Sequence, residues 1–179
     1  MACRHKKATC LPRRRVIGID IGLKCGFSVI EFGSGLTPKL VLSGTWKFGN
    51  ARNMGGGMVF IKFNQQLGAL ITQTRSSALG YEAVRFGHQG SAAAQVYYGM
   101  ESQLTALCEL YNLPFEGYSP GTIKKVAAGH GHASKEMVKQ VMGELFGDVV
   151  EDDNEADARA AAITLARKMG WDDDSSGDI

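Results

Sequence analysis

Runs of apolar residues mark three neighbouring strands in the first 50 residues. Residues 16–19 (VIGI) form an apolar run of the kind found in a buried central strand. Glycines bracket a turn over residues 22–26, and residues 27–32 predict a return strand. Residues 39–48 (KLVLSGTWKF) predict a third strand. The chain is therefore expected to open with a three-stranded meander.

The remainder alternates between helical and strand spacing. A glycine-rich loop is expected over residues 50–57. The elements predicted after it are helix 58–75, strand 79–84, helix 90–113, strand 114–119, and three further helices that begin at Pro120, after a Ser134 cap, and near Asp152. This order predicts an α/β domain with a mixed five-stranded sheet flanked by helices.

Composition agrees with one globular domain. The chain has 179 residues, 44% of them hydrophobic, which suffices for a single core. No apolar run approaches the roughly 20 residues of a membrane helix, and the basic start lacks the apolar centre of a secretory signal. We expect an intracellular, cytoplasmic protein with a basic extension (1–15), one domain (16–170) and an acidic tail (171–179).

The charge of the chain is unevenly distributed. Residues 151–179 contain nine acids and three bases, a net charge of −6. Because the whole chain has a net charge of +2, the first 150 residues have a net charge of +8. A basic domain with one cluster of acids suits a phosphate-rich partner, because cations bound by the acids can contact its phosphates.

Part of that cluster of acids has a structural explanation. In EDDNEADARAAA (151–162), Asp152 and Glu155 are spaced as in a capping box at a helix start. Asp157 lies more than one turn inside the expected helix, where capping no longer reaches. Asp153 and Asn154 precede it by four and three residues, so either can share its face of the helix.

Two more acids interrupt apolar strands. Asp20 lies in VIGIDIG and Glu82 in GYEAV, where a hydrophobic residue would be favoured. One such acid could be a satisfied buried residue, but two of them with Asp157 suggest converging carboxylates, which need cations to remain ionised together. Oxygen ligands favour magnesium or manganese, and two ions about 4 Å apart would support phosphodiester hydrolysis.

These residues resemble the RuvC family of Holliday-junction resolvases, in the ribonuclease-H-like superfamily, from about Val16 to Met169. GIDIGLKCGFSVI resembles the family's first strand with its aspartate, here Asp20. GYEAVRFGHQGSAAAQVYYGMESQL resembles the strand with the catalytic glutamate, here Glu82, and its following helix. EADARAAAITLA resembles the terminal helix with its metal-binding aspartate, here Asp157. The resemblance implies a ribonuclease-H-like fold and a RuvC-like nuclease domain over residues 16–170.

The resemblance also implies DNA contacts. SPGTIKKVAAGHGHASKEMV is similar to the family segment that carries two DNA-contacting lysines, here Lys124 and Lys135, and Lys125 belongs to the same basic set. A solvated charged face is the alternative. An aromatic residue near the family's glutamate packs at the opened centre of the junction. Phe86 is the candidate, with a core position as the alternative.

One position departs from the family pattern. The family has a second aspartate three residues before the last one, and this chain has Asn154 there. Asp153, one residue earlier, is a second candidate for the ligand. We expect a site with catalytic Asp20, Glu82, Asp153 and Asp157, with Asn154 as a further possible metal ligand, and with two Mg²⁺ ions that Mn²⁺ can replace.

The resemblance implies a structure-selective endonuclease that acts as a two-fold dimer on four-way junctions and related branched DNA, in a bacterial or phage-infected cell. The 90–113 helix is the expected dimer face, and its residues Tyr97, Tyr98, Leu104 and Leu107 are expected to lie either in the core or at that face. Two alternatives stay open. One is a DNA-binding relative that has lost cleavage, which Asn154 favours. The other is an actin-like phosphotransferase, because GIDIG…G also resembles that phosphate loop.

Overall fold

The computed structural model describes residues 14–33, 36–49, 56–85 and 92–171, and the terminal segments lie outside this part of the chain. One five-stranded sheet has the order β3-β2-β1-β4-β5. Its strands are β1 (Arg14–Asp20), β2 (Lys24–Gly33), β3 (Leu36–Lys47), β4 (Ala78–Glu82) and β5 (Phe115–Tyr118). The first three strands form an antiparallel meander, and β4 and β5 run parallel to β1. The mixed sheet is therefore confirmed.

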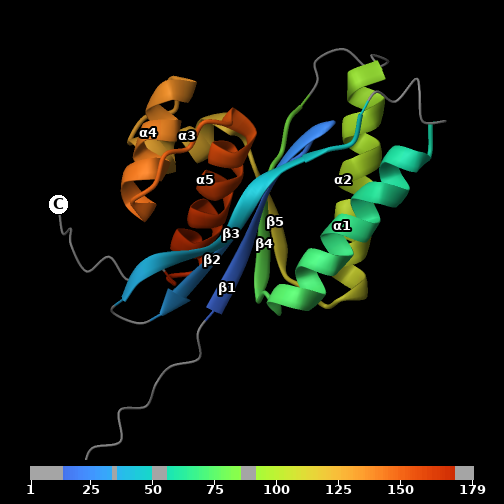
Figure 1. Ribbon diagram of the computed structural model, residues 1–179, viewed down its shortest axis with the longest axis horizontal. Helices are drawn as coiled ribbons and strands as arrows, with labels where there is room; N and C mark the ends of the chain where they lie inside the picture. The colour runs from blue at the N-terminus through green and yellow to red at the C-terminus, as the bar shows by residue number, and fades with distance from the viewer. Residues whose placement is uncertain (1–13, 34–35, 50–55, 86–91, 172–179) are drawn as a thin grey trace, which may run out of the picture.

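Helices cover both faces of the sheet (Figure 1). Helices α1 (Met58–Thr74) and α2 (Ala92–Leu110) pack on one face. On the other face lies α5 (Asp153–Lys168), with α3 (Pro120–Ala128) and α4 (Lys135–Phe146) packed against it. Each face has its own cluster of buried hydrophobic residues. None of the described helices combines the length and the apolarity that a membrane span requires.

Helix α5 approaches the sheet unusually closely because small residues line both surfaces. A Cβ atom on Gly18 of β1 would lie 1.8 Å from the carbonyl oxygen of Ala158, and one on Gly26 of β2 would lie 1.8 Å from that of Asn154. The Ser28 hydroxyl donates a hydrogen bond to the same Ala158 carbonyl at 3.0 Å. The alanine-rich sequence that favours a helix thus also lets its backbone rest on the strands.

The predicted elements are confirmed, with shifted boundaries. The third strand starts at residue 36 rather than 39, and the long helix ends at Leu110 rather than 113, while its expected start at residue 90 lies outside the described residues. Most of the expected glycine-rich loop lies outside the described residues. Helix α2 uses two of its four expected dimer-face residues within the protomer, because Tyr97 and Leu104 are buried in the core. Of the two expected positions, core or dimer face, these two side chains therefore occupy the core, and their place at a dimer face is wrong.

Candidate metal centre and DNA-binding surface

Three carboxylates converge at one edge of the sheet. Asp20 is the last residue of β1, Glu82 is the last residue of β4, and Asp157 lies in the second turn of α5. One oxygen from each of them lies within 4.8 Å of the others. Because β1 and β4 are adjacent and parallel, their carboxyl ends meet at the same edge. The structure thus brings together the two acids that interrupted apolar strands in the sequence and the one that lay beyond the reach of the helix cap.

Burial and repulsion between neighbouring carboxylates disfavour the charged forms of Asp20 and Asp157. The pKa of Asp20 is raised to about 8, chiefly by burial and then by the charges of Glu82 and Asp157. The pKa of Asp157 is raised to about 6 by burial and by Glu82, against the lowering effect of Lys135 and Lys124. Three half-buried carboxylates in this arrangement require a proton or a cation among them.

Tyr97 fixes the backbone beside Glu82. Its hydroxyl donates to the carbonyl oxygen of Glu82 and accepts from the N–H of Val84, both at 2.9 Å. The ring comes from α2 and is buried in the core. Sequence reasoning placed Tyr97 in the core or at a dimer face and missed this role, because its partners are main-chain atoms outside α2.

The start of α5 is capped as predicted, although only in part. Asp152 accepts hydrogen bonds from the N–H groups of Asn154 and Glu155 at 2.9 and 3.3 Å. The Asn154 side-chain amide also donates to Asp152, at 2.9 Å. The reciprocal half of the capping box is wrong, because the Glu155 carboxylate accepts instead from Ser43 and Arg159, each at 2.6 Å.

Asp153 lies outside the group of three carboxylates. Its two oxygens contact Lys135 Nζ at 3.1 Å and Lys139 Nζ at 2.9 Å. Hydrogen bonds from Lys139 and Lys135 lower the pKa of Asp153. The two neighbouring candidates for a fourth ligand are therefore engaged differently: Asp153 with two lysines, and the Asn154 amide with the helix cap.

The predicted DNA-binding lysines lie on α3 and at the start of α4. Helix α3 is capped by Ser119 and carries the half-buried Lys124 and the exposed Lys125. Lys135 is the first residue of α4. Lys124 and Lys135 are near enough to Asp157 to act on its pKa, so they flank the carboxylates. Phe86 lies outside the described residues.

A buried ion-pair network supports the same end of α5. Arg159 is 3% exposed and binds both oxygens of Asp148, at 2.7 and 2.8 Å, in addition to Glu155. Removing one member would leave a buried charge unpaired. The sequence suggested no role for Arg159, because an arginine in an acidic helix start resembles a solvated residue.

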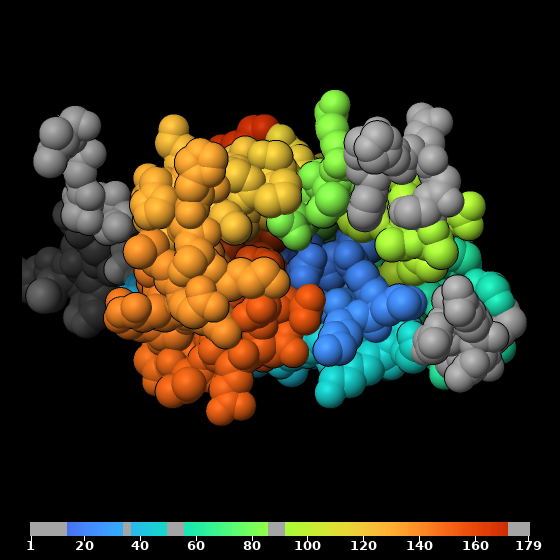
Figure 2. Space-filling model, turned by 90° about the horizontal axis from the view of Figure 1, so that it is seen from above, coloured from blue at the N-terminus to red at the C-terminus, as the bar shows by residue number. Residues whose placement is uncertain are grey.

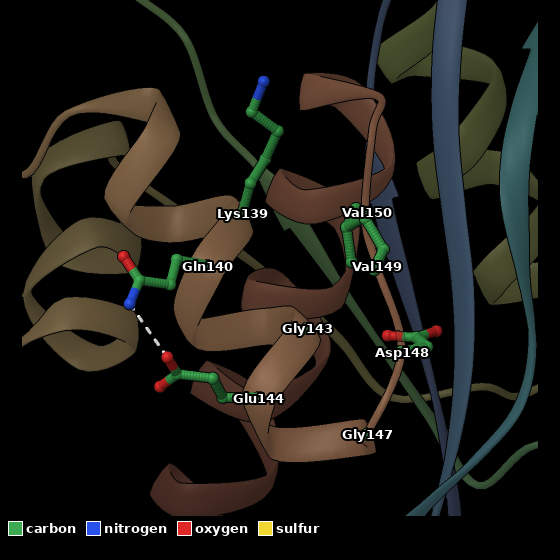
Figure 3. A pocket seen from close by; sticks show the side chains of 8 residues that line it. All are labelled: Lys139, Gln140, Gly143, Glu144, Gly147, Asp148, Val149 and Val150. Atoms are coloured by element: carbon green, nitrogen blue, oxygen red, sulfur yellow. Dashed lines mark hydrogen bonds between the residues drawn. The ribbon is translucent and has the colours of Figure 1, made fainter.

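A cavity of about 340 Å³ opens beside this network, between α4 and residues 147–150 (Figure 3). Gln140 donates to Glu144 along α4 at 2.8 Å, and Asp148 lies on the other side of the cavity. Gly143 permits the close passage of the segment, because a Cβ atom there would lie 2.6 Å from the Asp148 carbonyl oxygen. None of the three converging carboxylates lines this cavity, which separates it from the metal centre.

Comparison with known proteins gives one consistent family. The profile described as crossover junction endodeoxyribonuclease RuvC matches residues 16–165. Proteins of that name from Alkalilimnicola ehrlichii and Rickettsia prowazekii are 31% and 29% identical to this chain; each alignment covers 83% of this chain, and 88% and 94% of the respective relative.

Solved structures agree in fold. T. thermophilus RuvC in complex with Holliday junction substrate has a TM-score of 0.77 at 23% identity, with 88% of this chain and 97% of that chain covered. The yeast mitochondrial Holliday junction resolvase Ydc2 has a TM-score of 0.60 at 20% identity, with 92% and 82% covered. The expected ribonuclease-H-like fold is confirmed.

Proposed function

Because this chain belongs to the RuvC family of crossover junction endodeoxyribonucleases, we propose that it is a metal-dependent endonuclease that cuts Holliday junctions and related branched DNA. The observation that carries this proposal is the convergence of Asp20, Glu82 and Asp157 within 4.8 Å. These acids lie at an open sheet edge beside a basic surface, where a phosphodiester of DNA can reach them.

The donor set fits divalent magnesium. All three side chains offer carboxylate oxygens, the ligands that Mg²⁺ prefers, and Mn²⁺ accepts the same set. The raised pKa values of Asp20 and Asp157 reflect a charge excess that a cation would offset. We propose two ions per site, which when bound supply positive charge to activate an attacking water and to stabilise the leaving oxygen.

We propose Asp153 as the fourth ligand, in place of the family's aspartate at position 154. Its carboxylate is held by Lys135 and Lys139, and Lys135 is one of the lysines that we assign to DNA. A DNA phosphate that binds these lysines would compete with Asp153 and release its carboxylate toward the ions. Asn154 offers only an amide oxygen, which offsets less of a cation's charge.

We assign the DNA-facing surface to Lys124, Lys125 and Lys135, which bind phosphates and hold the scissile strand over the carboxylates. Lys124 and Lys135 are supported by their closeness to Asp157. The assignment of Phe86 to the opened centre of the junction rests on sequence alone.

The proposed assembly is a two-fold dimer, because two symmetric cuts in a junction require two sites in matching orientation. With Tyr97 and Leu104 committed to the core, α2 and the turn after it still expose Tyr98, Leu110 and Tyr111. These three apolar side chains replace the earlier set as the proposed contact face. We place the reaction in the cytoplasm of a bacterial or phage-infected cell.

A second candidate function is binding of branched DNA without cleavage. The observation that favours it is the engagement of both neighbouring candidates for the fourth ligand, Asp153 with lysines and Asn154 with the cap. Three converging carboxylates favour cleavage instead, since a binding protein gains nothing from their mutual repulsion.

Cleavage of a synthetic four-way junction, compared with a linear duplex of equal length, tests the proposal. The wild type should cut the junction only when Mg²⁺ is present. Asp20→Asn should reduce cleavage to background and leave junction affinity within about twofold, because it removes a metal ligand while the phosphate contacts remain. Junction binding without any cleavage by the wild type would favour the second candidate. Normal cutting by Asp20→Asn would refute the assignment of the site.

A further inference from the structure

A polar groove of about 510 Å³ lies between the end of β3 and α1. The residues that line it include Trp46, Lys47, Phe48, Lys62, Gln65 and Gln66. Lysine and glutamine side chains all offer hydrogen-bond donors, and none of the described residues that line the groove carries a carboxylate. Its lining therefore suits an anion that accepts several hydrogen bonds.

The strand register fixes the distance from this groove to the metal centre. Asp20 pairs with Gly26 on β2, and Gly26 pairs with Thr45 on β3. Adjacent strands lie about 4.8 Å apart, so the Cα atoms of Asp20 and Thr45 are roughly 10 Å apart. One DNA strand advances about 3.4 Å along the helix axis per nucleotide. The Cα atom of Thr45, which lines the groove, is thus roughly three nucleotide rises from that of Asp20.

A third cation lies beside Lys47 on the neighbouring strand. Lys24 is the register partner of Lys47 across β2 and β3, and both side chains are exposed. Neither forms a salt bridge with another residue in the described segments, whereas Lys135 and Lys139 are paired with Asp153. The charges of Lys24 and Lys47 are therefore not neutralised by an acid of the described segments.

The groove and the lysines of α3 and α4 lie on opposite sides of the metal centre. Figure 2 looks onto the end of the sheet where β1 and β4 finish. The tip of β1 and β2 (blue) lies in the middle, with α3 and α4 (yellow to orange) on one side and the end of β3 and α1 (cyan to teal) on the other. A strand crossing the carboxylates from α3 would continue toward the groove.

We propose that this groove, with Lys47 and Lys62 as its anchors, binds the phosphate backbone of the DNA strand that leaves the metal centre. The junction is then held on both sides of the cut, which fixes the scissile phosphate over the carboxylates. The inference rests on the proposed function, since it requires DNA to lie across Asp20, Glu82 and Asp157. A peptide added to the edge strand β3 would not require this concentration of lysines.

The test compares two charge-matched double variants. Lys47→Gln/Lys62→Gln removes the anchors, and Lys39→Gln/Arg75→Gln removes two exposed cations from the other ends of the same strand and helix. Each lost phosphate contact lowers the salt slope of junction binding by about 0.9. Between about 50 and 200 mM salt, the wild type should therefore lose roughly tenfold more affinity than the anchor variant. The control should match the wild type.

Footprinting locates the effect on the DNA. Hydroxyl-radical protection should weaken roughly three nucleotides from the cut in the anchor variant and persist in the control. Thermal melting with and without Mg²⁺ should give the same shift for the anchor variant and the wild type, because the carboxylates are unchanged.

Three results would overturn the inference. The first is that Lys47→Gln/Lys62→Gln has the same junction affinity and salt slope as the control, while Lys124→Gln/Lys135→Gln binds the junction more weakly. This result would overturn the role of the groove but not the proposed function. The second is that the anchor variant changes the oligomeric state in sedimentation without DNA, which would make the groove a contact between copies of this chain. The third is that the wild type does not bind a junction, which would also remove the proposed function.

Discussion

At the scale of single residues, the charge state of Asp20 determines how the protein responds to pH and metal. Its raised pKa, about 8, means that the folded metal-free protein holds a proton that the unfolded chain releases near pH 4. In EDTA, this group therefore lowers stability as pH rises from about 4 to 8. A bound cation reverses the effect, since it requires the deprotonated form.

We therefore predict that stabilisation by Mg²⁺ grows with pH. The rise in Tm on adding Mg²⁺ should be small near pH 5.5 and large near pH 8.5, where about 2.7 kcal/mol is expected at one hundred times the dissociation constant. Melting curves at both pH values, with Mg²⁺ or EDTA, measure this difference. Asp20→Asn should show little dependence, and an equal Mg²⁺ shift at both pH values in the wild type would contradict the prediction.

Asp153 and Asn154 can be separated by their effects on binding and on cleavage. Asp153→Asn should bind a junction a few-fold more tightly, because Lys135 and Lys139 lose the carboxylate that pairs with them. The same variant should cleave the junction much more slowly, because the proposed fourth carboxylate ligand is lost. Asn154→Ala should cost less activity, with at most about 1 kcal/mol of stability from the weakened helix start.

The measurement is single-turnover cleavage against Mg²⁺ concentration, together with junction affinity and Tm for both variants. Tighter binding with normal cleavage by Asp153→Asn would mean that Asp153 only neutralises lysines. An inactive, folded Asn154→Ala variant would instead assign the fourth ligand to Asn154.

Sequence reasoning identified the three converging acids because each broke a local pattern. Asp20 and Glu82 interrupted apolar strands, and Asp157 lay beyond the reach of the cap. The partners of Asp153 and Tyr97 could not be found in this way. Lys135 and Lys139 come from another helix, and Tyr97 bonds to main-chain atoms beside Glu82. Such contacts follow from how the elements pack, which local spacing does not specify.

At the scale of elements, the contact between α5 and the sheet sets the geometry of the metal centre. Gly18 lies two residues before Asp20, against the carbonyl of Ala158, which follows Asp157. The order and the type of the elements could be predicted from the spacing of apolar residues. The close approach of α5 to the sheet could not be predicted, because a glycine in a sequence is equally typical of a turn or of a weak strand position. Because α5 packs this closely against β1, the carboxylate of Asp157 lies near that of Asp20.

Gly18→Ala should therefore disturb both folding and chemistry. Its Cβ atom would lie 1.8 Å from backbone, which must move; overpacking of this kind costs about 1–3 kcal/mol or more. Gly57→Ala is the matched control, because a Cβ atom there meets nothing within 4 Å. We expect a Tm several degrees lower and slower cleavage for Gly18→Ala only. Unchanged melting of Gly18→Ala would contradict the packing described above.

At the scale of the whole molecule, one protomer carries one group of three carboxylates within the described residues. A four-way junction has two strands of like polarity to cut, so symmetric cutting requires a second copy in two-fold relation. We predict that the protein sediments as a dimer. The double variant Tyr98→Lys/Tyr111→Lys should shift the equilibrium toward monomer, because it places like charges from both protomers in the proposed contact face.

The dimer variant should retain its Mg²⁺-dependent rise in Tm, since none of the three carboxylates is changed. It should nick junctions rather than resolve them in paired cuts. A wild type that sediments as a monomer both alone and with junction DNA would count against the assembly.

The position of α5 in the chain has a consequence for the protein during its synthesis. Asp20 and Asp157 are 137 residues apart, so the ribosome makes the first ligand long before the last. At about 5–20 residues per second, the interval is roughly 7–27 s. Until α5 has emerged and packed against β1, the nascent chain has lysines and two acids but no complete ion site. A nuclease built in this order remains harmless to nearby DNA until α5 has been synthesised.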